Sequence, residues 1–329
     1  YVAALASEIS SFELQNSDDK NADQQPLSTD HPIDTIYIGG GTPSLLSPKQ
    51  LEKLLEAIHI KFPLAGDLDT TLEMNPGTVT PEKLTEYRSL GINRASFGVQ
   101  TFNDRSLKLL ARGHDSNDAE QTFDLLREAG FENVSFDLIA GLPNQSLKDW
   151  ERNLEKAIKM SPEHISLYLL EIHEGTPLAE QISSKRQPMP NEELAAQMYE
   201  LMLEMLSVSG FLQYEISNFS KPGFESKHNK KYWRCDPVIG VGVSAHSHDG
   251  IQTRWSNTAD TNAYVSSIEG GRSPLNERES LSRRQIMGEF MFLGLRLNRG
   301  IRFAEFEKRF GSSIQKEYGA NLKRFESLG

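Results

Sequence analysis

The stretch that decides the fold is TIYIGGGTP, residues 35–43, in which a short apolar run ends in three consecutive glycines. Four β-prone residues bounded by Gly and Pro are typical of a strand that stops at a turn. A helix-like segment, PKQLEKLLEAIHIKF (48–62), follows, so the run opens a strand–helix unit. The glycines leave the backbone open to close approach by a ligand, although a tight turn alone would also use them.

The same alternation recurs four more times along the chain. Each further run precedes a helical pattern: TTLEM (70–74), RASFGV (94–99), NVSFDLI (133–139) and HISLYLL (164–170). The expected helix starts and ends are marked by Pro48 and Pro81 and by Gly91, Gly130 and Gly210. This alternation predicts a parallel sheet with crossover helices, closed or partly closed into a barrel, and a doubly wound open sheet is the alternative.

Beyond Gly210 the alternation stops. The following residues are rich in Gly, His and aromatics, which favours strands and loops that close the end of the barrel. From about Ser282 the pattern is helical again and predicts a small second domain. We therefore expect a barrel domain over 1–275, with an extension at about 211–275, and a helical domain over 276–329.

Composition excludes several classes of function. The 329 residues carry 35 basic and 46 acidic side chains, a net charge of -11, and no basic stripe of the kind that binds a phosphate backbone. No run approaches the roughly 18 apolar residues of a membrane span. We predict a soluble, cytoplasmic protein without nucleic-acid partners, and peripheral membrane contact stays open. The single cysteine, Cys235, excludes any multi-cysteine metal site built by this chain alone.

The start and end of the sequence indicate a fragment. The chain begins with Tyr1 rather than Met and ends at Gly329 within a helical pattern. Between Phe12 and Pro32 the residues are polar and irregular, which predicts a solvated loop after a short first helix.

Polar residues stand at the end of four expected strands, at Gly40, Glu73, Gln100 and Asp137. In barrels and open parallel sheets, ligands bind outside the carboxyl ends of the strands. Each residue alone has a structural explanation, such as an ion pair between a strand carboxylate and Arg94. Their recurrence at one level predicts a binding pocket.

Together these motifs resemble one family. YIGGGTPS, LEMNPG, ASFGVQ with LARGH, and DLIAGLP are similar, in order and spacing, to the motifs of radical S-adenosylmethionine (SAM) enzymes of the oxygen-independent coproporphyrinogen oxidase type. The resemblance implies a partial (β/α)6 TIM-like radical SAM barrel, with its first strand missing here, and a small helical C-terminal domain. It also implies SAM contacts at the matching positions: Gly40, Gly41, Thr42, Glu73, Gln100, Arg112 and Asp137. SAM offers an ammonium, a carboxylate and hydroxyls, which suit acceptors, a guanidinium and amides. A lone Arg112 would more often be solvated.

The segment HNKKYW, residues 228–233, is similar to the HNxxYW motif of the haem-chaperone (HemW-type) branch of this family. The resemblance implies that His228 ligates haem iron and that Tyr232 and Trp233 flank the macrocycle. Composition alone favours a surface loop with a buried Trp. His246 and His248 are weaker candidates, and His246 could contact SAM instead.

One departure from the family is the lack of its CxxxCxxC loop, whose thiolates hold a four-iron four-sulfur cluster in the intact parent. In relatives a YVxALxxEI-like helix follows that loop, and this chain begins with YVAALASEI. Truncation is the simplest explanation, and a naturally cysteine-free descendant is the alternative. We predict that this chain alone binds no cluster and cleaves no SAM, because one thiolate cannot replace three.

The sequence therefore predicts a haem-binding chaperone that binds SAM and delivers haem to recipient haem proteins. The alternative is an oxygen-independent coproporphyrinogen III oxidase, which would use one-electron reduction of SAM to decarboxylate propionate side chains. The HNKKYW segment favours the chaperone. Whether the chain is an enzyme stays open, because the cluster cysteines are absent from it.

Overall fold

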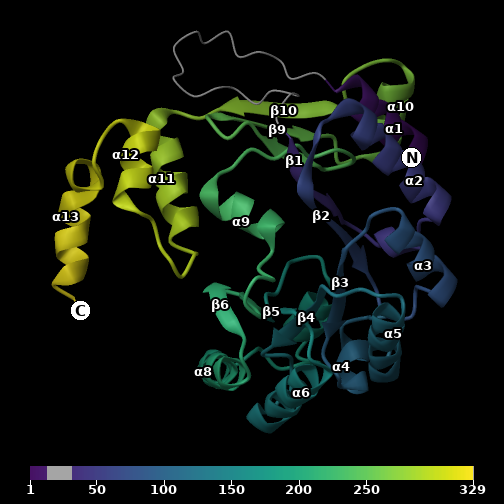
Figure 1. The fold of residues 1–329 in the computed structure, drawn as a ribbon. Helices are drawn as coiled ribbons and strands as arrows, with labels where there is room; N and C mark the ends of the chain where they lie inside the picture. The colour runs from purple at the N-terminus through teal and green to yellow at the C-terminus, as the bar shows by residue number, and fades with distance from the viewer. Residues whose placement is uncertain (13–31, 329) are drawn as a thin grey trace. The chain divides into compact units, whose positions relative to one another are not determined.

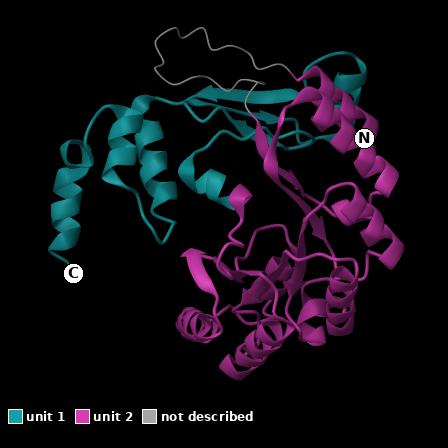
Figure 2. Ribbon diagram, in the orientation of Figure 1, with its two compact units in different colours: residues 1, 13–28, 229–329 teal, residues 2–12, 29–228 magenta. Residues whose placement is uncertain are grey.

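The computed structural model describes residues 1–12 and 32–328. Its contacts divide the chain into two compact units, drawn in magenta and teal in Figure 2. We call residues 2–12 and 32–228 the barrel unit, and Tyr1 with residues 229–328 the C-terminal unit. The loop predicted between Phe12 and Pro32 lies outside the described residues. The domain limit predicted at residue 275 stays a prediction.

Five parallel strands form the sheet of the barrel unit in the order in which they occur along the chain (Figure 1). An antiparallel hairpin extends this sheet, because its second strand pairs with the fifth parallel strand. The strands are β1 Ile33–Ile38, β2 Leu64–Met74, β3 Arg94–Gln100, β4 Val134–Ala140, β5 His164–Leu169, β6 Leu212–Glu215 and β7 Asn218–Ser220. All five predicted strands are confirmed. A doubly wound sheet would reverse its strand order part-way, and the five parallel strands do not.

The helices between these strands begin and end where the sequence predicts. At the start of α2, the Ser47 side chain accepts from the Gln50 amide, and Pro48 occupies the first turn. Gly91 and Gly130 follow α3 and α5 with φ of 90° and 81°, which suits a residue without Cβ. The helical elements of this unit are α1 Val2–Ser11, η1 Pro43–Leu45, α2 Pro48–Lys61, α3 Pro81–Ser89, α4 Asp104–Leu109, α5 Ser116–Glu128, α6 Leu147–Met160, α7 Pro177–Ser183 and α8 Glu192–Val208.

One apolar core joins the sheet to the crossover helices. Phe97 on β3 and Phe136 on β4 are fully buried, and their ring centroids lie 4.8 Å apart. Trp150 on α6 is also fully buried, and its indole nitrogen donates to the carbonyl of Met198 on α8 at 2.9 Å. Large side chains in such a core fix the strands beneath them, so the strand ends are held in place.

The C-terminal unit has its own core. Phe290, Phe306 and Phe310 pack around Met287 and Cys235. An antiparallel sheet in the order β10-β9-β8 precedes the helices that the sequence predicts from Ser282. The elements are β8 His246–His248, β9 Thr253–Asn257, α10 Thr261–Glu269, β10 Leu275–Ser280, α11 Arg283–Gly294, α12 Phe303–Phe310 and α13 Ile314–Glu326. None of the helices in the described parts of the chain is long and apolar enough to cross a membrane.

Candidate functional site

The carboxyl ends of β1 to β4 lie at one end of the sheet, because these strands run parallel. The structure therefore brings Gly40, Glu73, Gln100 and Asp137 to a single rim. We call this rim, together with Gly41, Thr42 and Arg112, the barrel mouth. The residues of the barrel mouth differ in their hydrogen-bond partners, their backbone conformation and their burial.

The glycine-rich loop and Glu73 form the first part of the barrel mouth. Glu73 Oε2 accepts from the Gly40 amide at 3.0 Å, and Oε1 accepts from the Tyr37 hydroxyl at 2.7 Å. A Cβ on Gly39 would lie within 2.9 Å of the Glu73 carboxyl, so only glycine allows this approach. Gly40 and Gly41 have φ of 78° and 62°, and a Cβ on either would meet nothing within 4 Å. The loop thus presents open backbone beside a carboxylate.

Thr42 closes the other side of the loop. Its hydroxyl oxygen accepts from the Asn75 side-chain amide at 3.1 Å. Ser44 bonds the Thr78 hydroxyl at 2.7 Å, and Thr78 in turn donates to the Asn75 carbonyl. These contacts tie the loop after β1 to the segment after β2, so the loop is fixed at both ends.

Gln100 is re-aimed by an irregularity at the end of β3. The register between β3 and β4 shifts between Phe97 and Gln100, and Gln100 has a φ of 64°, which is uncommon for a residue with a side chain. A Cβ on Gly98 would lie 2.5 Å from the Gln100 side-chain nitrogen and 3.2 Å from Arg112 Nη2. Gly98 therefore makes the space that Gln100 and Arg112 occupy.

Asp137 on β4 is the titratable group with the largest consequence for the barrel mouth. Burial raises the pKa of Asp137 to about 7, although a hydrogen bond from Ser166 and the charge of Arg112 oppose the rise. The charge of Glu73 adds to the rise. Burial also lowers the pKa of the Arg112 guanidinium, and Asp137 opposes that shift. Asp137 is thus coupled electrostatically both to Glu73 and to Arg112.

The barrel mouth offers what SAM requires. Carboxyl oxygens of Glu73 and Asp137 can accept from an ammonium or from hydroxyls, and the fork of Arg112 can pair with a carboxylate. The glycine loop provides exposed backbone beside these groups. The donors and acceptors present therefore fit SAM chemically.

His228 is held against β1 of the barrel unit. It lies on α9, Lys227–Arg234, and its imidazole stacks on the Tyr37 ring with centroids 4.7 Å apart and planes inclined by 16°. His228 Nδ1 lies 3.5 Å from Thr35 Oγ1. Either atom can donate in this contact, depending on the tautomer of His228. In the tautomer that carries its proton on Nδ1, His228 donates to the Thr35 oxygen and the lone pair is on Nε2. Histidines that ligate iron commonly have this arrangement, so the His228 imidazole is suited to ligate haem iron.

Tyr232 and Trp233 belong to the C-terminal unit, on the later part of α9. Tyr232 is exposed, one helical turn after His228. Trp233 lies under the guanidinium of Arg296, which is 4.3 Å from the ring centroid, and it lines a cavity of about 1290 Å³ with Phe290 and other residues. The sequence-based alternative of a surface loop is wrong in one respect, because HNKKYW is helical.

The weaker histidine candidates lie on β8 of the C-terminal unit. His246 is exposed. His248 Nδ1 accepts from the Gly250 amide at 3.1 Å, and burial lowers the pKa of His248. An imidazole whose Nδ1 already accepts a backbone hydrogen bond has its proton on Nε2 in the neutral form, which disfavours iron ligation there.

The described residues do not fit an iron–sulfur cluster. Residues 1–12 and 32–328 contain no group of three or more His, Cys, Asp or Glu side chains that could hold a metal ion. Cys235 is buried, and burial raises the pKa of its thiol to about 11, so the thiolate form is disfavoured. We therefore assign no chemical step to a cluster in this chain.

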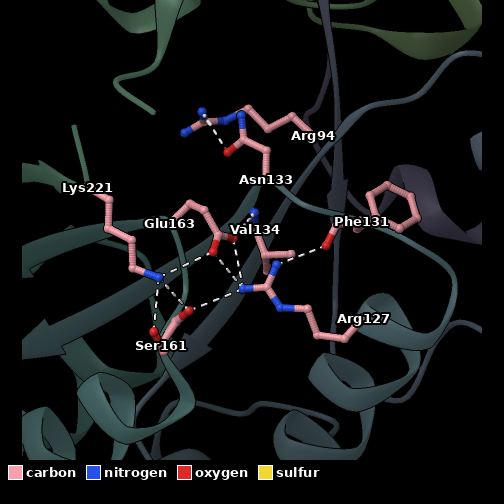
Figure 3. A network of polar contacts seen from close by, with 8 residues as sticks. All are labelled: Arg94, Arg127, Phe131, Asn133, Val134, Ser161, Glu163 and Lys221. Carbon is pink, nitrogen blue, oxygen red and sulfur yellow. Dashed lines mark hydrogen bonds and ion pairs between the residues drawn. The ribbon is translucent and has the colours of Figure 1, made fainter. Parts of the chain in front are cut away.

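Arg94 lies outside the barrel mouth, although its charge lowers the pKa of Asp137. It begins β3 and donates to Asn133 Oδ1 at 3.1 Å (Figure 3). It also donates to the Phe224 carbonyl at 3.2 Å. Among the described residues, no ion pair joins Arg94 to a strand carboxylate, and its effect on Asp137 is limited to the longer-range effect of its charge. Sequence reasoning also missed Thr35, Tyr37 and Gly98. Thr35 and Tyr37 could have been identified from their spacing, because residues two apart on a strand lie on the same face of the sheet.

Comparisons with known proteins show the family and the fold. The family model described as the Radical SAM superfamily matches residues 23–157, and the model of the HemN C-terminal domain matches residues 281–329. Coproporphyrinogen III oxidase (HemN) of Escherichia coli superimposes with a TM-score of 0.80 at 21% identity, covering 100% of this chain and 75% of that one. This likeness shows the fold, a curled parallel half-barrel of the radical SAM type, as the sequence predicts.

Two curated relatives are more similar in sequence. The heme chaperone HemW of Bacillus subtilis is 37% identical over 298 residues, covering 90% of this chain and 78% of that protein. The heme chaperone HemW of Lactococcus lactis is 36% identical over 323 residues, covering 98% and 80%. The chain belongs to the HemW family of radical SAM proteins.

Proposed function

We propose that this chain is a haem chaperone that binds haem iron through His228 and binds SAM in the barrel mouth. The seated imidazole of His228 carries the proposal, because it combines a fitting ligand geometry with the HNKKYW segment. The HemW relatives named heme chaperone support it. Recipient haem proteins are the expected partners, and the cytoplasm is the expected location.

Each residue of the barrel mouth has a proposed role toward SAM. Glu73 accepts from the ammonium, Arg112 pairs with the carboxylate, and Asp137 accepts from a ribose hydroxyl. Gly40, Gly41 and Thr42 offer backbone groups, and Gln100 offers its side-chain amide. In radical SAM proteins this cofactor supplies one-electron chemistry when a cluster reduces it. The described residues provide no such cluster, so we propose binding and positioning only.

The test of this function is a haem titration of His228→Ala beside the unaltered chain. Loss of the axial ligand should weaken haem binding by at least about tenfold and shift the haem absorption band. His173→Ala is the matched control, since the His173 side chain is 73% exposed and lies outside both proposed sites. Circular dichroism should show the same folded content in all three proteins.

Equal affinity and identical spectra would remove His228 as the ligand, and His246 and His248 would then be substituted in turn. Binding of a coproporphyrinogen but not of haem would instead favour the oxidase alternative. A chain that binds no haem would contradict the chaperone function itself.

A further inference from the structure

One side chain contacts both proposed sites of the barrel unit. Tyr37 lies on β1, two residues before Gly39, where its ring stacks on the His228 imidazole. Its hydroxyl donates to Glu73 Oε1 at 2.7 Å. Tyr37 is thus in direct contact with the proposed iron ligand and with a carboxylate of the barrel mouth.

Thr35 also contacts the imidazole. Residues 35 and 37 point to the same face of β1, and Thr35 Oγ1 lies 3.5 Å from His228 Nδ1. The Tyr37 ring limits the tilt of the imidazole, and the Thr35 oxygen limits its rotation about the ring normal. A shift of Tyr37 therefore moves one of the surfaces that the imidazole contacts and favours a different orientation of His228.

The position of Tyr37 depends in turn on Glu73. The two Glu73 oxygens are used by different donors, the Tyr37 hydroxyl and the Gly40 amide. A cationic group that approaches Glu73 competes for these oxygens, since a full positive charge attracts the carboxylate more strongly than the neutral Tyr37 hydroxyl does. A change of partners at Glu73 thus reaches His228 through a single intervening side chain.

We propose that Tyr37 is a positioning residue that links Glu73 to His228, so that occupation of the barrel mouth changes the affinity of His228 for haem iron. This inference rests on the proposed function and adds its regulation. The linkage is reciprocal, so haem on His228 also changes the affinity of the barrel mouth for its ligand. The size of the effect is limited by how differently Glu73 bonds Tyr37 in the two states.

A double-mutant cycle on haem binding tests the link without requiring SAM. Glu73→Gln removes the carboxylate charge, and Tyr37→Phe keeps the stacked ring while removing the hydroxyl. We expect Glu73→Gln to change the haem dissociation constant about fivefold when Tyr37 is intact and by less than about twofold in the Tyr37→Phe background. Equal changes in the two backgrounds, or no change in either, would overturn the link.

A second measurement follows the imidazole itself in the haem-free chain. Ring nitrogen resonances of His228, assigned by their loss in His228→Ala, should shift on Glu73→Gln only when the Tyr37 hydroxyl is present. A general loss of structure would move His173 as well, so His173 serves as the internal control. Identical His228 shifts in both backgrounds would overturn the link even if haem binds. Failure of the unaltered chain to bind haem would refute the proposed function. The His228 resonances would still show whether Tyr37 links Glu73 to His228, because they are measured without haem.

Discussion

The two ends of the same parallel strands use similar residues in opposite ways. At the amino ends, Glu163 before β5 accepts from the Val134 amide and pairs with Arg127 at 2.8 Å and Lys221 at 3.4 Å (Figure 3). At the carboxyl ends, the Asp137 carboxyl has a pKa raised to about 7. The Glu163 carboxylate is paired with two cations, whereas the Asp137 carboxyl is buried in surroundings that disfavour its charged form.

The histidines show the same contrast. His164 at the start of β5 is buried, with Nδ1 bonded to Ser135 at 2.8 Å and Nε2 to Tyr214 at 2.8 Å. His228 is only partly buried and is seated on β1 by Tyr37. Polar groups that are fully bonded inside a fold stabilise it, whereas groups held in strained or desolvated positions at strand ends mark a site. The comparison therefore separates structural residues from candidate functional ones.

The largest expected effect is on stability at the amino ends. Glu163→Ala leaves two cations without their shared carboxylate and an amide without its acceptor, so we expect the free energy of unfolding to fall by about 3 kcal/mol. Chemical denaturation measures this change. SAM and haem affinities should stay the same, because Glu163 lies away from the barrel mouth.

The matched control for Glu163 is Glu120→Ala, which breaks the more exposed pair of Glu120 with Lys156. A pair of this kind contributes below about 1 kcal/mol. Equal losses for the two variants would contradict the distinction between the buried network and surface ion pairs.

The next effect is a pH dependence from Asp137. Its pKa rises from 3.8 to about 7 on folding, so the folded state holds a proton that the unfolded state releases. The stability from this group is present below about pH 4 and is lost as the pH rises to about 7. Three pKa units correspond to at most about 4 kcal/mol. Asp137→Asn should remove this dependence.

Asp149 provides a control of opposite sign. Hydrogen bonds from Ser146 lower the pKa of Asp149, so its contribution is present above the unfolded pKa and is lost as the pH falls. Unfolding curves from about pH 2 to pH 8 separate the two groups, because Asp137→Asn should alter the dependence between about pH 4 and 7 and Asp149→Asn only the dependence below about pH 4. A dependence that survives in Asp137→Asn would show that another group causes it.

Local sequence signals predicted the strands and the four rim positions, because apolar runs, Pro and Gly act within a few residues. The contacts that define the sites were not predictable in this way. Thr35 meets His228 across 193 positions of chain, and such pairs follow from packing rather than periodicity. The strand β10, LNERES, was also missed, since it is mostly exposed and charged and shows no apolar alternation.

The smallest expected effect tests the space beside Gln100. Gly98→Ala places a Cβ 2.5 Å from the Gln100 side-chain nitrogen and 3.2 Å from Arg112, and both contacts are with the far ends of flexible side chains. These ends can move, so the free energy of unfolding should change by less than about 1 kcal/mol. They cannot move without leaving the barrel mouth, so SAM affinity in calorimetric titration should fall about tenfold, or about 1.4 kcal/mol.

Gly66→Ala is the control, because its Cβ meets nothing within 4 Å. An unchanged affinity in Gly98→Ala would mean that SAM binding does not depend on the positions of Gln100 and Arg112, and the barrel mouth would reduce to the glycine loop, Glu73 and Asp137.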